Sequence, residues 1–382
     1  MAGAAQDSGP PQAPPFGTGT LAEVLPSACG ALGLAGFSDV LRIGSHSSAV
    51  PRHIVIVLVD GLGWRQLQAA ADHAPHVVGR GESISTAFPS TTPVGLATLG
   101  TGSAPGMHGM VGATFFLPET DGILHPLTWA DDPHPQAIQP EMTVLERAEA
   151  AGASVHAIGP RAFARSGLTR AALRGGNYVG ADSVGERIAE AAVRDSGPAL
   201  TYVYWGDLDK TGHVHGVDSD AWRLELEHVD SIIERLRRSL EPESLLVVTA
   251  DHGMIDCPDA AHVDIDAMKP LQQGVRRIAG EPRMRHVYAR TGAAAAVAAT
   301  WAEELEGRAW VLSREGAVDA GLFGDTEADY ADRIGDVLAI ARDSTSLVSP
   351  RTDALVSALR GQHGSLTPAE MEIPLIVLTG GD

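Results

Sequence analysis

The chain has 382 residues, of which 44% are hydrophobic and 20% are charged, and its formal net charge is −20. This composition is typical of a globular protein with a sizeable core, and it excludes an intrinsically disordered chain. The negative charge repels nucleic-acid phosphates and no dense Lys/Arg cluster opposes it, so we expect no nucleic-acid polymer as a partner. An anionic substrate would then need local positive charge, which bound metal cations supply.

The cysteines and the N-terminal segment indicate in which cellular compartment the protein is expected. The two cysteines, Cys29 and Cys257, form no CxxC pattern, which favours a reducing compartment over a disulfide scaffold. The N-terminus has neither the basic nor the apolar region of a signal peptide. The chain also lacks an uncharged apolar run of the about 18 residues that a spanning helix needs. We therefore expect a cytoplasmic protein that does not enter a membrane.

Residues 1–20 are rich in Pro and Gly and are predicted to form a flexible tail. The first strand is predicted at His53–Val59, a near-continuous apolar run of the kind found in buried parallel strands. Similar apolar runs predict further strands at Val155–Ile158, Leu200–Tyr204, Leu245–Ala250 and Pro374–Leu378.

Helical patterns lie between these strands, at Thr143–Ala151, Ser183–Arg194 and Asp220–Leu240. In the last of them, Leu224, Val229, Ile232, Ile233 and Leu236 recur close to the helical period. Strands that alternate with helices predict an α/β fold, with a central mostly parallel sheet flanked by helices on both faces.

The segment from 281 to 345 has a different pattern. This pattern predicts a strand at Arg285–Ala289, a helix at Ala293–Leu305, and two more strands at Ala309–Leu312 and Gly335–Ala341. We interpret 281–345 as a small α+β cap inserted into a catalytic domain formed by 21–280 and 346–382.

The first segments that suggest chemistry contain Asp60 and Thr92. Asp60 directly follows the first predicted strand, at the sheet edge where α/β proteins bind ligands. Pro93 suits the first position of a helix, which predicts Thr92 as its N-cap and places the hydroxyl at the positive helix end. A metal ion can remove the hydroxyl proton without a separate base. Taken alone, Asp60 is explained equally well as a turn residue, and Thr92 is better explained as a helix cap.

Three later segments are rich in Asp and His. Asp209 and His213 are four residues apart in a Gly-containing stretch, read as a tight path, beyond the strand Leu200–Tyr204. Asp251 and His252 follow the strand Leu245–Ala250, and His363 precedes the last strand. Each pattern alone is compatible with an ordinary turn. Together the segments predict ligands for two metal ions: Asp60, Thr92, Asp209, His213, Asp251, His252 and His363.

The ordered motifs VDG, PSTTP, TG, HG, DLDKTGHVHG, TADHGM and QHG resemble the alkaline phosphatase superfamily, and are most similar to its nucleotide pyrophosphatase/phosphodiesterase branch. The resemblance implies Asp60, Thr92, Asp251 and His252 around one metal, and Asp209, His213 and His363 around the other. It also implies a nucleophile ten residues before Gly102, which is Thr92, with Thr91 as second choice. The fold that it implies is a mostly parallel sheet between helices, with an inserted lid.

Two departures from the family pattern concern the substrate. The Asn that diesterases of this branch carry after HG is absent from Met110–Ala113, which leaves nucleotide specificity open. The Arg that monoesterases and sulfatases carry after the nucleophile is also absent, since Pro93, Val94 and Gly95 follow Thr92. A dianionic monoester would be poorly neutralised, so diesters or pyrophosphates are favoured.

These observations predict a phosphodiesterase or nucleotide pyrophosphatase that works through a phospho-threonine on two divalent ions, with zinc preferred over manganese or iron. The expected partner is a small phosphorylated substrate, such as a nucleotide. The alternatives are a phosphonate hydrolase, a phosphomonoesterase, a phosphoglycerate-mutase-like phosphotransferase, and an inactive binding protein. We interpret Lys210 as a surface residue, and Phe115, Phe116 and Trp129 as core residues.

Overall fold

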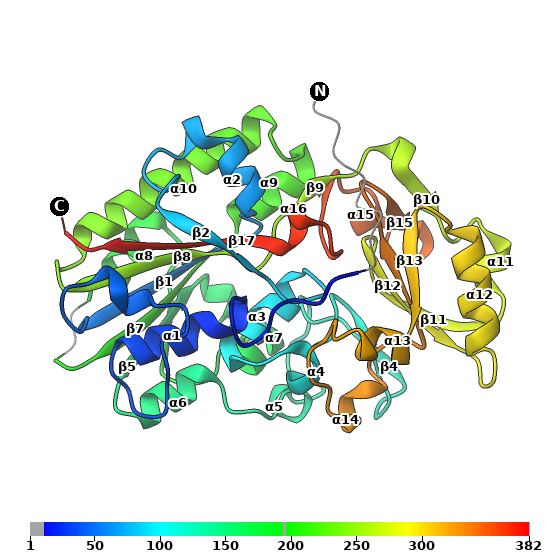
Figure 1. Ribbon diagram of the computed structural model, residues 1–382, viewed down its shortest axis with the longest axis horizontal. Coiled ribbons are helices and arrows are strands. Elements are labelled where there is room, and N and C mark those ends of the chain that lie inside the picture. Colours follow the sequence, from blue (N-terminus) through cyan, green and yellow to red (C-terminus); the bar gives the residue numbers. More distant parts are fainter. Residues whose placement is uncertain (1–10, 194–195, 382) are drawn as a thin grey trace.

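A computed structural model describes residues 11–193 and 196–381. Its centre is a seven-stranded sheet in the order β2-β17-β8-β1-β7-β5-β6 (Figure 1). The strands are β1 (His53–Val59), β2 (Gly81–Ser85), β5 (Ser154–Gly159), β6 (Asn177–Gly180), β7 (Ala199–Trp205), β8 (Ser244–Thr249) and β17 (Glu372–Thr379). β17 runs antiparallel to both of its neighbours, and the other pairs are parallel. The predicted α/β fold is confirmed.

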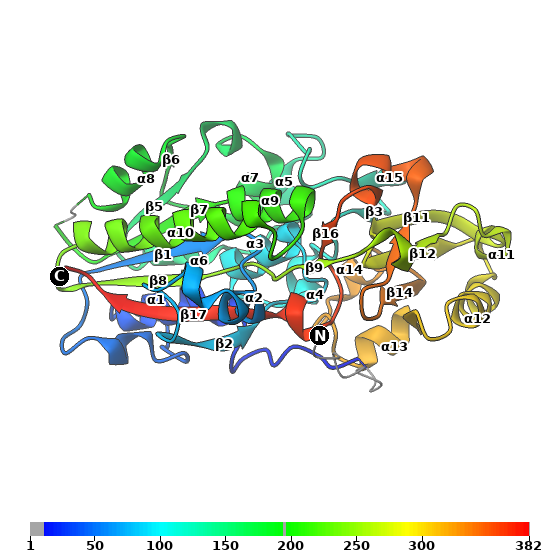
Figure 2. The same cartoon turned by 90° about the horizontal axis from the view of Figure 1, so that it is seen from above.

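Two helical layers cover this sheet (Figures 1 and 2). One face carries α1 (Val24–Ala31), α3 (Thr92–Thr101), α6 (Val144–Ala150) and α7 (Gly167–Ala172), and the other carries α2 (Trp64–Ala69), α8 (Val184–Ala191), α9 (Asp207–His215) and α10 (Asp220–Ser239). Because it is shielded on both faces, β1 is buried from Ile54 to Val59.

The three predicted helices form, and a side-chain cap explains where each of them starts. Thr143 and Ser183 each form a capping box with the glutamate three residues later, so α6 and α8 begin one residue after the predicted start. α10 begins after Ser219, whose hydroxyl accepts the N–H of Trp222. The predicted end of the second helix, Arg194, lies outside the described residues.

A second, four-stranded antiparallel sheet lies at one end of the molecule, in the order β11-β12-β14-β13 (Figure 1). Its strands are β11 (Val275–Glu281), β12 (Met284–Ala289), β13 (Ala309–Ser313) and β14 (Val337–Ala341), and α12 (Ala294–Glu304) packs against it. The sheet has its own buried cluster around Trp301. It includes β11, which precedes the predicted boundary at 281, and the division into a catalytic domain and a cap stays a prediction.

Short elements complete the described chain. Three small sheets pair β3 (Phe115–Leu117) with β4 (Gly122–Leu124), β9 (Ile255–Asp256) with β16 (Gly361–Gln362), and β10 (His262–Asp264) with β15 (Ser346–Val348). The short helices are α4 (Pro105–His108), α5 (Pro135–Ile138), α11 (Lys269–Gln272), α13 (Arg314–Asp319), α14 (Ala328–Ala331), α15 (Pro350–Ser357) and α16 (Pro368–Met371). The 3-10 turns are η1 (Leu21–Glu23), η2 (Ile43–His46), η3 (Ala71–His73), η4 (Arg161–Phe163) and η5 (Asp259–Ala261).

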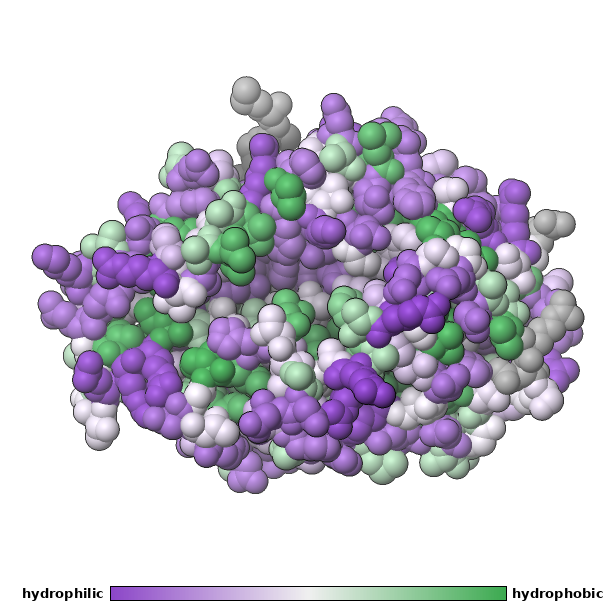
Figure 3. Space-filling view, turned by 180° about the vertical axis from the view of Figure 1, so that it is seen from behind, coloured by the Kyte–Doolittle hydropathy of each residue, from purple (hydrophilic) through white to green (hydrophobic). Residues whose placement is uncertain are grey.

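Half of the predicted N-terminal tail, residues 1–10, lies outside the described residues. Within 11–20, Thr20 forms a β-bridge with Ser85, and its hydroxyl accepts the N–H of Ala22 at the start of η1. The surface opposite the view of Figure 1 is mainly hydrophilic, with separate hydrophobic groups (Figure 3). Among the described helices, none is long and apolar enough to cross a membrane.

Candidate metal centre and nucleophile

Asp60 stands at the carboxyl end of β1, where its backbone N–H donates to Trp205 on the neighbouring β7 (2.8 Å). Its side chain is 3% exposed and turns toward the loops that follow β7 and β8. Gly61 follows with φ +74°, and a Cβ there would lie 3.0 Å from the Cα of Asp209. The VDG glycine therefore provides both the left-handed turn and the close approach of α9.

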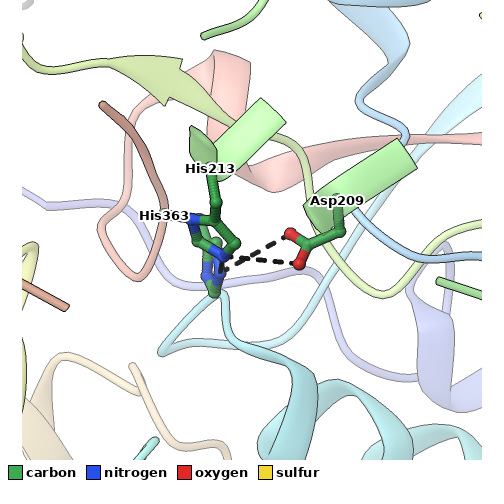
Figure 4. Close-up of side chains that lie close together, drawn as sticks. All are labelled: Asp209, His213 and His363. Carbon is green, nitrogen blue, oxygen red and sulfur yellow. Dashed lines mark hydrogen bonds and ion pairs between the residues drawn. The ribbon is translucent and has the colours of Figure 1, made fainter. Parts of the chain in front are cut away.

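Asp209 and His213 lie on α9, so the segment predicted as a tight path is a helix. Residues four apart share one helical face, and Asp209 Oδ2 lies 3.3 Å from His213 Nε2. Both side chains point toward His363, which comes from the loop after β16 (Figure 4). His363 Nε2 is 3.3 Å from His213 Nε2 and 3.9 Å from Asp209 Oδ1.

Asp251 and His252 follow β8 and are fully buried. His252 Nε2 lies 3.4 Å from Asp60 Oδ1 and 3.6 Å from Asp251 Oδ2. The imidazoles of His252 and His363 stack, with ring centroids 3.7 Å apart. The five predicted segments therefore meet at one place, beyond the carboxyl ends of β1, β7 and β8.

Backbone carbonyls set the tautomers of all three histidines. Nδ1 of His213, His252 and His363 is bonded to the carbonyl oxygens of Gly361 (2.7 Å), Gly253 (3.0 Å) and Ser90 (2.9 Å). A carbonyl oxygen only accepts, so each Nδ1 carries the proton and each Nε2 presents a lone pair. The 3.3 Å contact between His213 and His363 then brings two lone pairs together, which is repulsive unless a cation lies between them.

The carboxylate oxygens of the aspartates in the site are also suited to binding a cation. Asp60 Oδ1, Asp209 Oδ1 and Asp251 Oδ2 are buried and find no hydrogen-bond partner among the described residues, which is costly for carboxylate oxygens. Two ligand groups have their atoms within 4.8 Å of one another, Asp209–His213–His363 and Asp60–Asp209–His252. Ligand atoms about 2.0 Å from a tetrahedral zinc are about 3.3 Å apart, which is the spacing seen here.

Burial and mutual repulsion shift the pKa values of these groups. Burial, and then the Asp60 charge, raises the pKa of Asp209 to about 7, and burial, followed by the Asp209 charge, raises that of Asp251 to about 7. Burial, with the charge of Asp251, raises the pKa of Asp60 well above its usual value. Burial lowers the pKa of His252 to about 4. A cation bound beside these groups would favour the ionised carboxylates and suit the neutral imidazoles.

Thr92 lies beside this cluster, with its hydroxyl 3.2 Å from His252 Nε2. The prediction that Thr92 is the N-cap of its helix is wrong by one residue. Thr91 is extended (φ −139°, ψ 148°) and its carbonyl accepts the N–H of Gly95, so Thr91 is the cap and Thr92 begins α3. The Thr91 side chain instead interacts with the carboxyl group of Glu281.

Two residues of the site are missing from the predicted set. Tyr204 donates its phenolic hydrogen to Asp60 Oδ2 (2.5 Å), and Glu281 lies beside His363. Tyr204 belongs to the motif that contains Asp209, and its place at a strand end is a usable signal. Glu281 offers none, because it comes from the second sheet. Lys210 is exposed, while Phe115 and Trp129 are buried and Phe116 is partly buried.

Residues 54–366 match the type I phosphodiesterase/nucleotide pyrophosphatase family. The chain belongs to this family. The match covers all seven predicted ligand positions, from Asp60 to His363. The resemblance in the motifs predicted this branch of the alkaline phosphatase superfamily, and the prediction is confirmed.

Solved structures of the family share the fold. Murine ectonucleotide pyrophosphatase/phosphodiesterase 5, an inactive threonine-to-alanine variant in complex with AMP, has a TM-score of 0.68 and 19% identity, covering 84% of this chain and 87% of that chain. Phosphonoacetate hydrolase from Sinorhizobium meliloti 1021, in complex with phosphonoformate, has a TM-score of 0.65 and 20% identity, covering 86% and 90%.

The curated relatives are phosphopentomutases and match only a part of the chain. That of Rhizobium meliloti is 37% identical over 118 residues, 30% of this chain and 28% of the relative. That of Shewanella denitrificans is 28% identical over 156 residues, 40% of this chain and 37% of the relative. The chain therefore aligns with well under half of the length of these relatives.

Proposed function

We propose that the protein is a two-metal phosphodiesterase or nucleotide pyrophosphatase in which Thr92 is the nucleophile. The observation that carries the proposal is the position of the Thr92 hydroxyl, 3.2 Å from His252 Nε2 and beside buried carboxylate oxygens that have no hydrogen-bond partner among the described residues. Asp60, Asp251 and His252 would hold one ion together with Thr92, and Asp209, His213 and His363 the other. Zinc suits these nitrogen and oxygen ligands, and manganese or iron is the alternative.

Two divalent ions held by these residues would neutralise substrate charge, favour loss of the hydroxyl proton and stabilise the leaving oxygen. Thr92 Oγ1 then forms a bond to phosphorus while the bond to the leaving oxygen breaks, giving a phospho-threonine. Attack by water on the same phosphorus frees Thr92. Because Thr92 is in the first turn of α3, the helix N-terminus also favours the negative charge of the transferring group.

A monoanionic substrate fits the charges of this site better than a dianionic one. The site contains three aspartates, of which Asp60 and Asp251 are buried and Asp209 is partly buried, and Pro93, Val94 and Gly95 supply no cation after the nucleophile. Two divalent ions balance three carboxylates and the single charge of a diester with little excess. A phosphate diester, or a pyrophosphate whose attacked phosphorus carries a single negative charge, is therefore the proposed substrate class.

Two other functions have specific support. A phosphonate hydrolase is favoured by the structural likeness to phosphonoacetate hydrolase. A phosphotransferase acting on a sugar phosphate is favoured by the partial identity to phosphopentomutases. Both activities would use the same metal ligands. They would differ in the residues that bind the rest of the substrate.

Substrate profiling tests the proposal against these alternatives. Chelated protein reloaded with zinc or manganese would be assayed with bis-p-nitrophenyl phosphate, p-nitrophenyl phosphate, phosphonoacetate and a pentose phosphate. We expect the diester to be cleaved with the highest kcat/KM, and only after metal is restored. A clear preference for phosphonoacetate, or isomerisation of the pentose phosphate, would assign the alternative instead.

A further inference from the structure

Glu281 ends β11 and brings a buried carboxyl group from the second sheet to the candidate metal centre. It is 7% exposed, and its Oε1 finds no hydrogen-bond partner within residues 11–193 and 196–381. The side chain is not one of the ligand groups of the centre. A buried carboxyl group without a full set of partners is costly, so its position calls for an explanation.

Glu281 contacts His363, which is a candidate ligand, and two residues next to candidate ligands, Thr91 and Gly364. Its Oε2 lies 3.7 Å from Nδ1 of His363, the nitrogen that carries the ring proton. It also interacts with the Thr91 side chain. A Cβ on Gly364 would lie 2.6 Å from Glu281 Oε1, so the glycine of the QHG motif leaves the space that this carboxyl group fills.

The turn that carries Glu281 is held rigidly against the central sheet. Arg283, in the same turn, forms two hydrogen bonds with Glu370 (3.0 and 2.8 Å), and both side chains are fully buried. Glu370 Oε1 also accepts the N–H of Ser365, two residues after His363. The β11–β12 turn and the His363 loop are thus fixed to the same carboxylate, and bidentate pairs of this kind have little freedom.

We propose that Glu281 is a positioning residue for the Asp209–His213–His363 metal site, through which the four-stranded sheet controls the affinity of that ion. This inference rests on the proposed function, because it needs a metal at that site. The carboxyl group, 3.7 Å from Nδ1, acts electrostatically on the N–H that His363 donates to the Ser90 carbonyl, and so makes Nε2 a better donor to a cation. Outer partners of metal-binding histidines typically change metal affinity by about 10- to 100-fold.

Metal binding by chelated full-length protein tests this without relying on catalysis. Zinc would be titrated by calorimetry and cobalt by its visible absorption, for wild type and Glu281→Gln, which keeps the shape and removes the charge. Glu303→Gln, an exposed glutamate on α12 of the same subdomain, is the matched control. We expect wild type and Glu303→Gln to bind two ions alike, and Glu281→Gln to weaken one of them by about 10-fold or more.

His213→Ala identifies which ion is affected, since it removes a ligand of only one group. In His213→Ala protein, which should keep one ion, adding Glu281→Gln should leave the remaining affinity unchanged. Unchanged binding of both ions by Glu281→Gln, or equal weakening of both, would overturn the inference. Wild type that binds no metal would instead overturn the proposed function.

Discussion

At the residue scale, the hydrogen bond between Tyr204 and Asp60 decides how one ligand is presented. The phenol occupies Oδ2 at 2.5 Å, which leaves Oδ1 as the oxygen that faces His252. Tyr202, two residues earlier on β7, is buried, and its hydroxyl finds no hydrogen-bond partner among the described residues. Tyr204 therefore orients a candidate ligand, and Tyr202, which does not, serves as its control.

Tyr204→Phe is expected to lower zinc affinity by about 10-fold or more, because Asp60 loses the partner that fixes its rotamer. Tyr202→Phe should leave the affinity unchanged, since it removes a hydroxyl without a partner. Competition with a chromophoric chelator measures both variants. Equal affinities for wild type and Tyr204→Phe would show that the tyrosine does not orient Asp60.

The ligand types were predictable at this scale, but their orientation was not. His213, His252 and His363 stand in motifs that the sequence shows directly. The tautomer of each depends on a carbonyl of Gly361, Gly253 or Ser90, and two of these carbonyls come from segments remote in sequence. Glu281 was missed for the same reason, since only the folded chain brings it to His363.

At the element scale, α3 carries Thr92, the proposed nucleophile, and packs closely on the loop after β8. A Cβ on Gly95 would lie 2.7 Å from Cβ of Asp251 and 3.0 Å from its carbonyl oxygen. Neither atom is the end of a flexible side chain, so the helix or the ligand loop would have to move. Gly185 on α8 has open space around it instead.

Gly95→Ala should therefore destabilise the chelated protein by about 1–3 kcal/mol, although alanine is the better helix former. It should also weaken zinc binding, because Asp251 is displaced. Gly185→Ala, in contrast, should gain about 0.5–1 kcal/mol. Urea unfolding measures both variants, and a stabilised Gly95→Ala protein would contradict the described packing.

The sequence predicted long elements well and their ends less well. Continuous apolar runs located β1, β7 and β8 to within one residue at each end. The cap of α3 was misplaced because the extended conformation of Thr91 depends on its surroundings. α9 was not recognised as a helix because Gly212 and the polar side chains obscure its periodicity. A Cβ on Gly212 would lie 2.5 Å from Sδ of Met254, so packing explains that glycine.

At the scale of the whole molecule, buried histidines away from the metal centre make stability depend on pH. His286 is fully buried, with Nε2 bonded to the Val111 carbonyl and Nδ1 accepting the N–H of Gly335. Burial lowers the pKa of His286 to about 4, and that of His108 to about 3. Both side chains therefore stay neutral in the folded protein at pH values where the unfolded chain is protonated.

The free energy of unfolding should fall as the pH decreases from about 6.5 to about 4, because the unfolded chain takes up protons that folded His286 does not. In His286→Gln, the unfolded and folded states should differ by about one bound proton less, so the free energy of unfolding should fall less steeply over this pH range than in wild type. This difference in slope does not depend on the stability of the variant at neutral pH. Urea unfolding of chelated wild type and variant across this range measures the slopes. Parallel slopes would show that His286 is protonated in the folded protein.

The proposed role of Thr92 as the nucleophile at the metal centre is tested most directly by diester cleavage in protein of known metal content. Wild type, Thr92→Ala and Thr91→Val would be loaded to the same number of zinc ions per chain and assayed with bis-p-nitrophenyl phosphate. We expect Thr92→Ala to lose roughly three orders of magnitude or more in kcat, and Thr91→Val to stay within about 10-fold of wild type. A fully active Thr92→Ala protein, or loss of activity only in Thr91→Val, would contradict the assignment of Thr92 as the nucleophile.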